Sequence, residues 1–174
     1  MSASIPPVSG APGKSDTLIF RSFNPELCEE LRSWFTTPQQ IVFWSGLKFG
    51  FPDSVIQFRA QLKLAQIPAY ALLSEEENQL LGFGQMMYDN GRCHFVRVAT
   101  NPTRRGQGYG KKLLACLLAQ GQRKFNPQFF SLFVNQSNQV AINLYRAVGF
   151  KHTQYPGPMP NTQSWYLEKP AGSL

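Results

Sequence analysis

Apolar residues recur at helical spacing near the start of the chain. Residues 17–23 form a short apolar segment that we interpret as a strand. Asn24-Pro25-Glu26 then has the features of a helix start: an N-cap, a proline in the first turn and an acid. The positions that follow form one apolar helix face, made of Leu27, Leu31, Trp34 and Phe35.

A second helix is predicted after a less regular segment. We interpret Thr37-Pro38 as the end of the first helix, and residues 39–52, rich in aromatics and glycines, as an irregular loop. Asp53 or Ser54 is the expected cap of a helix that runs to about residue 66.

The apolar pattern changes from helical to alternating spacing after this helix. Residues 69–73, 79–88 and 92–100 are predicted strands. Asp89-Asn90-Gly91 is the expected hairpin turn between the last two, because Asn and Gly tolerate a positive φ. Three successive strands predict an antiparallel meander.

The last third of the chain mixes both patterns. A glycine-containing segment at residues 106–110 leads into a predicted helix that runs to about residue 123. A strand at residues 128–134 and a helix at residues 138–148 follow, and a final hairpin is expected from residues 150–153 and 163–168. The order β-α-α-β-β-β-α-β-α-β-β predicts the α+β class, with a mixed central sheet.

Length and composition favour one folded domain. A chain of 174 residues fits a single core, which we place at residues 16–170, after a flexible tail at residues 1–15 rich in Pro, Ser, Gly and Ala. The tail lacks the basic start and apolar stretch of a signal peptide, and no apolar run is long enough to span a membrane. Cys28, Cys93 and Cys116 form no CxxC pair and are interpreted as reduced thiols. These features predict a cytoplasmic protein without a membrane segment or a metal site.

The formal net charge of +7 favours an acidic partner. Nucleic acid, an anionic membrane surface and a polyphosphate cofactor all fit the charge alone. The densest basic cluster brackets the glycine segment and consists of Arg104, Arg105, Lys111 and Lys112.

The glycine segment has the features of an anion site. The first amides of a helix have no internal partner, and the helix dipole adds partial positive charge there. Gly106, Gly108 and Gly110 would let phosphate oxygens approach the backbone, although an ordinary strand-to-helix turn would explain two of the three glycines. A Walker A loop is excluded because Lys112 stands where Ser or Thr is required, and a dinucleotide fold is excluded by the preceding meander.

Two motifs in register resemble the GCN5-related N-acetyltransferase (GNAT) family. Arg105, Gly108 and Gly110 match its signature of Gln or Arg, two residues, Gly, one residue, then Gly or Ala. Downstream, a second family motif is matched by Asn138, Ala141, Leu144, Tyr145, Gly149 and Phe150. The resemblance covers about residues 17–168. It implies a GNAT-type mixed sheet of six to seven strands, flanked by about four helices.

The resemblance also implies an acetyl-CoA-dependent N-acetyltransferase in which the amine attacks the thioester directly. The strand end would hold the pantetheine arm and the acetyl oxygen, and the glycine loop would hold the pyrophosphate. Asn138 would bind the cofactor arm or simply cap its helix. The full set of implied cofactor residues is Val98, Ala99, Thr100, Arg105, Gly106, Gln107, Gly108, Tyr109, Gly110, Lys111 and Asn138.

Two residues are candidates for proton transfer. Tyr145 occupies the family's general-acid position, and its alternative is a core tyrosine, since Ala141 and Val148 share its helix face. His94 stands where many members carry a glutamate base, and strict alternation would place it on the same strand face as Val98. The alternative for the base is a water relay.

The acceptor is expected to be a primary amine of a small molecule, a peptide or a protein. By resemblance it would bind between residues 39–52 and 155–163. Phe43, Trp44 and Phe49 could form an apolar wall there or simply pack the helical flap onto the sheet. A low-pKa amine, such as an α-amine, needs least help from a base. Nucleic acid is not an expected partner, and a monomer or a homodimer fits the sequence. The competing function is an acetyl-CoA-binding sensor or regulatory module without turnover.

Overall fold

The computed structural model describes residues 17–46, 48–76 and 78–172, and the predicted tail at residues 1–15 lies outside them. Within the described chain, seven strands form one sheet in the order β1-β2-β3-β4-β5-β7-β6. Only β4 and β5 pair in parallel; the other neighbours are antiparallel. The strands are β1 (Leu18–Ser22), β2 (Ala69–Ser74), β3 (Leu80–Asp89), β4 (Arg92–Thr100), β5 (Phe129–Asn135), β6 (Lys151–His152) and β7 (Ser164–Pro170). The predicted meander and mixed α+β sheet are confirmed.

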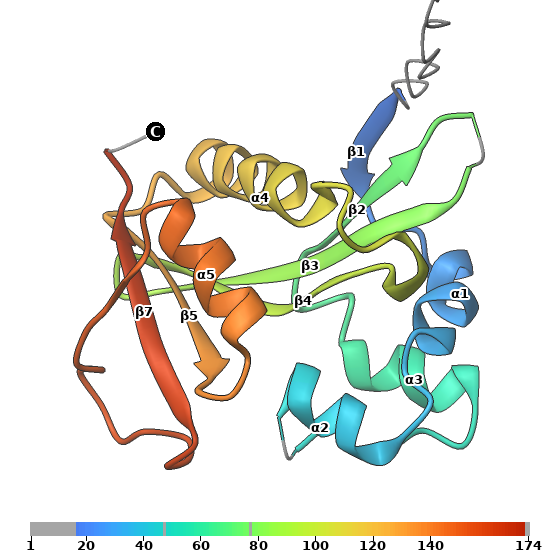
Figure 1. The fold of residues 1–174 in the computed structure, drawn as a ribbon, viewed down its shortest axis with the longest axis horizontal. Helices are drawn as coiled ribbons and strands as arrows, with labels where there is room; N and C mark the ends of the chain where they lie inside the picture. The colour runs from blue at the N-terminus through green and yellow to red at the C-terminus, as the bar shows by residue number, and fades with distance from the viewer. Residues whose placement is uncertain (1–16, 47, 77, 173–174) are drawn as a thin grey trace, which may run out of the picture.

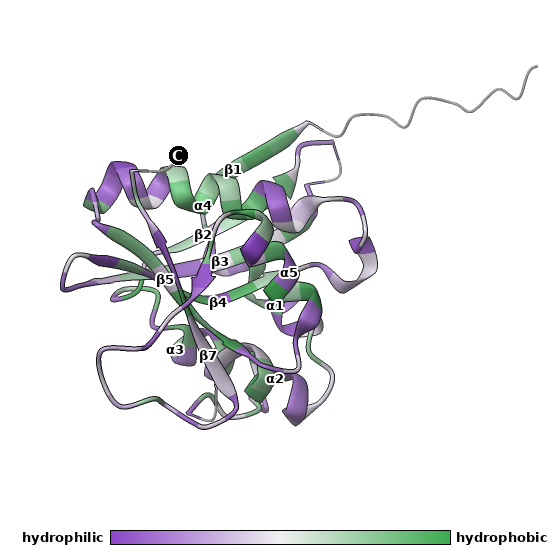
Figure 2. Ribbon diagram, turned by 60° about the vertical axis from the view of Figure 1, so that its left-hand side comes forward, coloured by the Kyte–Doolittle hydropathy of each residue, from purple (hydrophilic) through white to green (hydrophobic). Residues whose placement is uncertain are grey.

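Helices cover both faces of this sheet (Figure 1). One core lies beneath α4 (Tyr109–Phe125) and α5 (Gln139–Ala147). A second core lies beneath α1 (Cys28–Ser33), α2 (Pro38–Ser45) and α3 (Val55–Leu62), which with their connections form the helical flap, residues 25–62. Figure 2 shows hydrophobic and hydrophilic residues alternating along α4, as expected for a helix with one buried face.

The second helix of the flap was not predicted. Thr37 accepts a hydrogen bond from the Gln40 amide at 3.3 Å, while the Gln40 side chain accepts one from the Thr37 amide, and Pro38 occupies the first turn. Thr37-Pro38 therefore starts α2 (Pro38–Ser45) instead of only ending the first helix, and the predicted loop at residues 39–52 is wrong over residues 39–45. As a result, the described chain has five α-helices, where about four were predicted.

A β-bulge interrupts the alternation of β4. The register with β3 shifts between Phe83 and Gln85, and Arg97 adopts a positive φ of 52°. After the bulge Val98 packs against the core beneath α4 and α5, as Phe95 does before it. His94, one residue before Phe95, faces the opposite side. The strict alternation that placed His94 and Val98 on one face is therefore wrong.

The parallel pair at the sheet centre separates partway along. The β4–β5 register joins Arg92–Phe95 to Phe129–Leu132. Beyond it β4 follows β3 as far as Thr100, whereas β5 follows β7 as far as Asn135. Figure 1 shows the two strands diverging from this point. We call this separation of β4 and β5 beyond Phe95 and Leu132 the splay. The backbone edges of the two strands that face each other across the splay do not pair with each other.

Gly121 tests how tightly α4 packs on the sheet. A Cβ at this position would lie 2.9 Å from both Cys93 Sγ and Phe130 Cε1. We expect Gly121→Val to lower the free energy of unfolding by about 2 kcal/mol because the core cannot accommodate the added volume. Urea unfolding measures the change. The same substitution at Gly50, where nothing lies within 4 Å of the Cβ position, is the control. Equal stability of the two variants would contradict this packing.

Candidate active site

The glycine turn before α4 is open to solvent. Gly106 and Gly108 adopt φ values of 77° and 80°, and nothing lies within 4 Å of a Cβ built at either position. Gly108 is the N-cap of α4 and supplies no side chain, and the first turn of this 17-residue helix contains no acid. The positive end of a long helix therefore faces an unobstructed turn, as anion binding requires.

The third glycine has a different role. A Cβ on Gly110 would lie 2.9 Å from Leu144 Cδ2 and 3.8 Å from Thr100 Cγ2. Gly110 is therefore needed for close packing of α4 against α5 and the end of β4. An ordinary strand-to-helix turn would explain the positive φ values of Gly106 and Gly108, whereas Gly110 is explained by its close packing.

The predicted cofactor residues gather at one end of the splay. Arg105, Gln107, Lys111 and Lys112 are exposed around the turn, whereas the Tyr109 side chain is buried. The two salt bridges of the described chain, Arg32–Glu29 and Arg92–Glu168, do not involve these cations. Val98 packs beside the core under α4 and Ala99 beside the core under the flap, so β4 ends between the two cores.

Asn138 caps its helix. Its side-chain oxygen accepts a hydrogen bond from the Ala141 amide at 3.1 Å. This is the capping alternative considered for the residue, and it uses one lone pair of the side-chain oxygen. The side-chain NH₂ group can still donate to a cofactor arm.

Tyr145 lies on α5 beside the sheet. Its side chain is 8% exposed, and its ring packs edge-on against Phe150. Among the described residues, none hydrogen-bonds its hydroxyl. Burial raises the pKa of Tyr145 to about 12, so the phenol keeps its proton throughout the neutral range. Tyr145 can therefore act as a donor but not as a base.

His94 lies at the point where β4 and β5 begin to separate. Its Nδ1 is 2.9 Å from Ser131 Oγ, and its ring packs edge-on against Phe133 with centroids 5.1 Å apart. Burial lowers the pKa of His94 to about 4, so the ring is neutral at pH 7. As a simple base it is weak, because taking a proton from an ordinary lysine ammonium would be uphill by roughly 6 pKa units.

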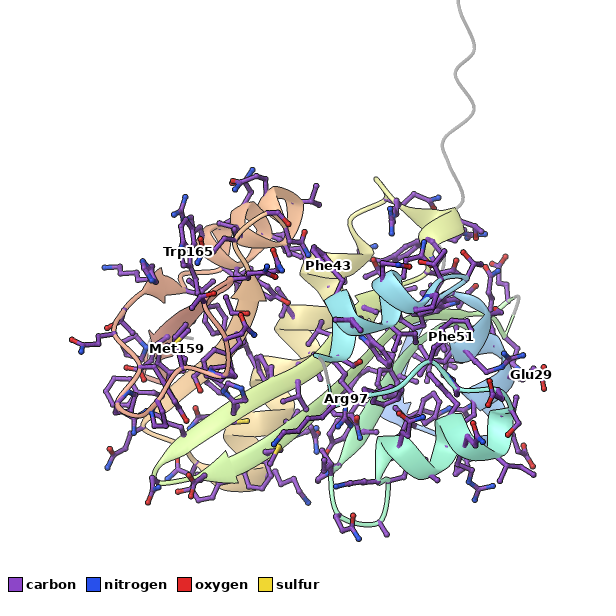
Figure 3. All side chains as sticks on the ribbon, turned by 90° about the horizontal axis from the view of Figure 1, so that it is seen from below. Glu29, Phe43, Phe51, Arg97, Met159 and Trp165 are labelled. Carbon is purple, nitrogen blue, oxygen red and sulfur yellow. The ribbon has the colours of Figure 1, made fainter. Side chains whose placement is uncertain are left out.

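The three predicted acceptor residues separate into two groups. Phe43 is 48% exposed and lines a cavity of about 370 Å³ whose other lining residues are all uncharged: Asn135, Gln136, Ser137, Thr162 and Gln163. This cavity joins α2 to the start of β7, and Figure 3 shows Phe43 between α2 and the C-terminal part of the chain. Residues of both predicted acceptor segments are thus brought together.

Trp44 and Phe49 instead pack inside the flap. The Trp44 ring stacks on Phe35 and Phe58, and Phe49 is only 4% exposed beneath the Arg97 guanidinium. These contacts favour the packing alternative for both Phe49 and Trp44. Helix formation by α2 causes this division, because it turns Ile41, Trp44 and Ser45 inward and Phe43 outward.

Sequence reasoning missed the polar neighbours of His94. Ser131 is 1% exposed and is the one polar residue in the otherwise apolar run Phe129–Val134. A lone hydroxyl in a buried strand was the available signal, because such a group needs a partner. The partner itself could not be read from the sequence.

Comparison with known proteins identifies a shared family and fold. The family model described as "Acetyltransferase (GNAT) family" matches residues 26–150. The UPF0039 protein C11D3.02c of Schizosaccharomyces pombe is 34% identical over 86 residues, which span 49% of this chain and 48% of that protein. The aligned region is thus about half the length of this curated relative.

Solved structures share the fold over most of the chain. A spermidine N-acetyltransferase from Vibrio cholerae, in complex with CoA and spermine, has a TM-score of 0.69 at 14% identity and covers 89% of this chain and 96% of its own. An N-acetyltransferase from Staphylococcus aureus Mu50 has a TM-score of 0.68 at 16% identity and covers 89% and 99%. The Vibrio enzyme has also been solved as a dodecamer. None of the helices in the described part of this chain has the length and apolar character needed to span a bilayer.

The lowered pKa of His94 predicts a pH-dependent stability. An unfolded histidine binds its proton near pH 6.5, whereas the native ring does so only near pH 4. Between these values the unfolded state binds more protons, so stability falls as the pH drops through this window. We expect the free energy of unfolding to fall by about 2 kcal/mol more in the wild type than in His94→Gln between pH 7 and pH 5.

Urea unfolding at the two pH values measures this difference. The carboxylates titrate in both proteins, so the comparison isolates His94. Equal losses in the two proteins would show that His94 is solvated and charges normally.

Proposed function

Because this chain belongs to the acetyltransferase (GNAT) family, we propose that it transfers an acetyl group from acetyl-CoA to a primary amine by direct attack on the thioester. The enzymes of this family are acyl-CoA-dependent N-acetyltransferases, and acetyl-CoA is their cofactor. A cytoplasmic location and a monomeric or homodimeric state stay predictions.

The open turn at Gly106 and Gly108 is the observation that carries the proposal. Gly106 and Gly108 have positive φ values and empty space around both Cβ positions, so side chains do not cover the backbone just before α4. A pyrophosphate would accept hydrogen bonds from these amides, and Arg105 and Lys111 would add charge at the rim. The turn lies beside the splay of β4 and β5, so a cofactor held there could extend its arm between the strands.

The separated strand end would orient the thioester. Backbone groups of β4 after the bulge do not pair with β5, so they are available to the pantetheine amides and to the acetyl oxygen. Amides directed at a carbonyl oxygen stabilise the negative charge that develops on it during attack. Val98, Ala99 and Thr100 are the residues proposed for this role.

Tyr145 is proposed as the general acid. A departing thiolate has a pKa of about 8.5 if it resembles a cysteine, well below the value of about 12 for Tyr145 in the free protein. Burial would raise the thiolate pKa as well, which narrows this gap inside the site. At the least, the phenol donates a hydrogen bond that lowers the cost of expelling the thiolate.

The proposed acceptor pocket is the uncharged cavity beside Phe43. Its lining offers amide and hydroxyl groups and one aromatic ring, but no carboxylate. A bound polyamine would need carboxylates to pair with its positive charges, and the lining of this cavity contains none. We therefore propose an acceptor with a single low-pKa amine, such as an α-amine, next to uncharged groups.

A panel of amines tests the function. We expect acetyl-CoA to raise the melting temperature, and an amine of suitable shape to cause release of free CoA thiol. α-Amines should react faster than polyamines, because more of the amine is neutral at pH 7. Thermal stabilisation without release from any amine would favour the sensor alternative. No stabilisation at millimolar cofactor would refute the proposal.

Replacing the proposed acid separates catalysis from binding. Tyr145→Phe removes one hydroxyl, so we expect turnover to fall about 100-fold while the Kd for acetyl-CoA changes less than twofold. Thiol release and calorimetric titration measure the two quantities. Tyr70→Phe on β2, which removes a buried hydroxyl bonded to the Gln120 side chain, is the matched control. Normal turnover in Tyr145→Phe would remove this residue from the mechanism.

A further inference from the structure

Three polar residues form a row across the sheet beside the splay. His94 on β4 is the Cα partner of Ser131 on β5, and Ser131 is the partner of Glu168 on β7. Directly paired residues project from the same face, so the three side chains lie side by side. Seen from below in Figure 3, this C-terminal half of the sheet lies under the loop that contains Met159, while α2 and α3 lie over the other half.

Hydrogen bonds link the groups at each end of this row. His94 Nδ1 is 2.9 Å from Ser131 Oγ, and the Tyr166 hydroxyl donates to Glu168 Oε2 at 2.9 Å. Burial raises the pKa of Tyr166, and the neighbouring Ser131 hydroxyl, as a donor to the phenol oxygen, lowers it. Arg92 Nε closes the chain with a 2.9 Å bond to the same Glu168 oxygen.

A single direction of donation connects the histidine to the carboxylate. Glu168 can only accept, so Tyr166 must donate to it, and the Tyr166 oxygen is then free to accept from Ser131. In this arrangement Ser131 donates to Tyr166, and its own oxygen accepts from His94 Nδ1–H. The other ring nitrogen, Nε2, therefore carries a lone pair, and no described residue hydrogen-bonds it.

The surroundings keep this chain dry. Ser131 and Tyr166 are each 1% exposed, and the rings of Phe133, Tyr155 and Tyr166 pack around one another beside His94. Its middle is buried and its two ends are partly exposed: His94 is half-buried at one end, and at the other the Glu168 side chain is 17% exposed and the Arg92 side chain 30%. A buried line of donors that ends at a partly exposed carboxylate has the geometry of a proton path.

We propose that Ser131, Tyr166 and Glu168 hold His94 with its Nε2 lone pair toward the acceptor amine and carry the amine proton from His94 to the protein surface. This proposal rests on the proposed function. His94 is the catalytic residue in it, and the other three groups are positioning and relay residues. They replace the glutamate that the sequence lacks at position 94 with a carboxylate two strands away.

The proton balance of the relay is complete. After the amine nitrogen bonds to the acetyl carbon, its N–H proton passes to His94 Nε2 while Nδ1–H passes to Ser131 Oγ. Ser131 then gives its proton to Tyr166, and Tyr166 gives its own to Glu168, which releases it to water. The thiolate leaves separately with the proton from Tyr145, and Tyr145 then takes a proton from water. His94 is neutral before and after, so its weakness as an isolated base does not stop the transfer. It ends in the Nε2–H form, so before the next turnover the ring exchanges this proton through water for one on Nδ1, and the Ser131 and Tyr166 hydroxyls turn back.

The tautomer of His94 tests the geometry without any turnover. The chain has two histidines, so ¹⁵N spectra of the imidazole rings at pH 7 contain two ring systems, and His152→Gln assigns them. We expect wild-type His94 to be at least about 90% in the Nδ1–H form, because in the proposed arrangement Ser131 directs its proton to Tyr166 and accepts from the ring. Tyr166→Phe and Ser131→Ala should lower this fraction, and Tyr70→Phe should not. A wild-type ring protonated on Nε2 would overturn the proposal.

Turnover then tests the relay itself. Glu168→Gln keeps an acceptor oxygen for Tyr166 but removes its basicity, so the His94 tautomer should persist while kcat falls roughly 10- to 100-fold. Tyr166→Phe should lose both the tautomer and kcat. In each variant the Kd for acetyl-CoA should stay within twofold of wild type. Tyr70→Phe is again the matched control, since it loses a buried tyrosine hydrogen bond outside the chain of relay groups.

The outcomes separate the two proposals. Unchanged kcat in Glu168→Gln and Tyr166→Phe, in an enzyme that releases thiol, would overturn the relay and leave the acetyltransferase function intact. A wild-type protein that releases no thiol from any amine would overturn both, whatever the tautomer of His94.

Discussion

The site depends on the early end of the parallel pairing between β4 and β5. Four residues of β4 pair with β5, and then each strand follows its outer neighbour. Unpaired backbone groups are costly when buried, so a sheet opens at its centre only where something else satisfies them. The bulge at Arg97 and the divergence of the strands leave such unpaired backbone groups in the middle of the fold, and these groups need hydrogen-bond partners. A cofactor with amides and carbonyls along its arm would supply these partners.

The proposed catalytic groups flank this opening from opposite faces, and both are neutral. Burial raises the pKa of Tyr145 to about 12 and lowers that of His94 to about 4, so neither is charged at pH 7. The fixed charges lie at the edges: cations around the glycine turn on one side and the Arg92–Glu168 pair on the other. This separation lets charge be bound at the rim while proton transfers take place in a drier interior, where hydrogen bonds are stronger.

The fold was largely accessible from the sequence, with errors where local signals compete. The meander, the hairpin turn at Asn90-Gly91 and helices α4 and α5 follow from alternating or helical spacing and from local turn residues. The error at α2 arose because Thr37-Pro38 both ends one helix and caps the next, and proline favours both interpretations. The sequence also placed His94 and Val98 on the same face of β4, which is wrong. A bulge adds one residue without any obligatory sequence signal, and Arg97 is an unusual residue for a positive φ.

The local parts of the site can be read directly from residue order: a glycine turn opening a helix, the helix caps, and the register of two motifs that place the chain in its family. These features depend on backbone conformation within a few residues, where residue type is decisive. The surroundings of His94, in contrast, exist only in the folded protein. Ser131 lies 37 positions away in sequence and Glu168 still farther, and three strands must pair in register before the hydroxyls and the carboxylate line up. Long-range pairing sets burial, and burial sets protonation, so the chemistry of the site is a property of the assembled sheet.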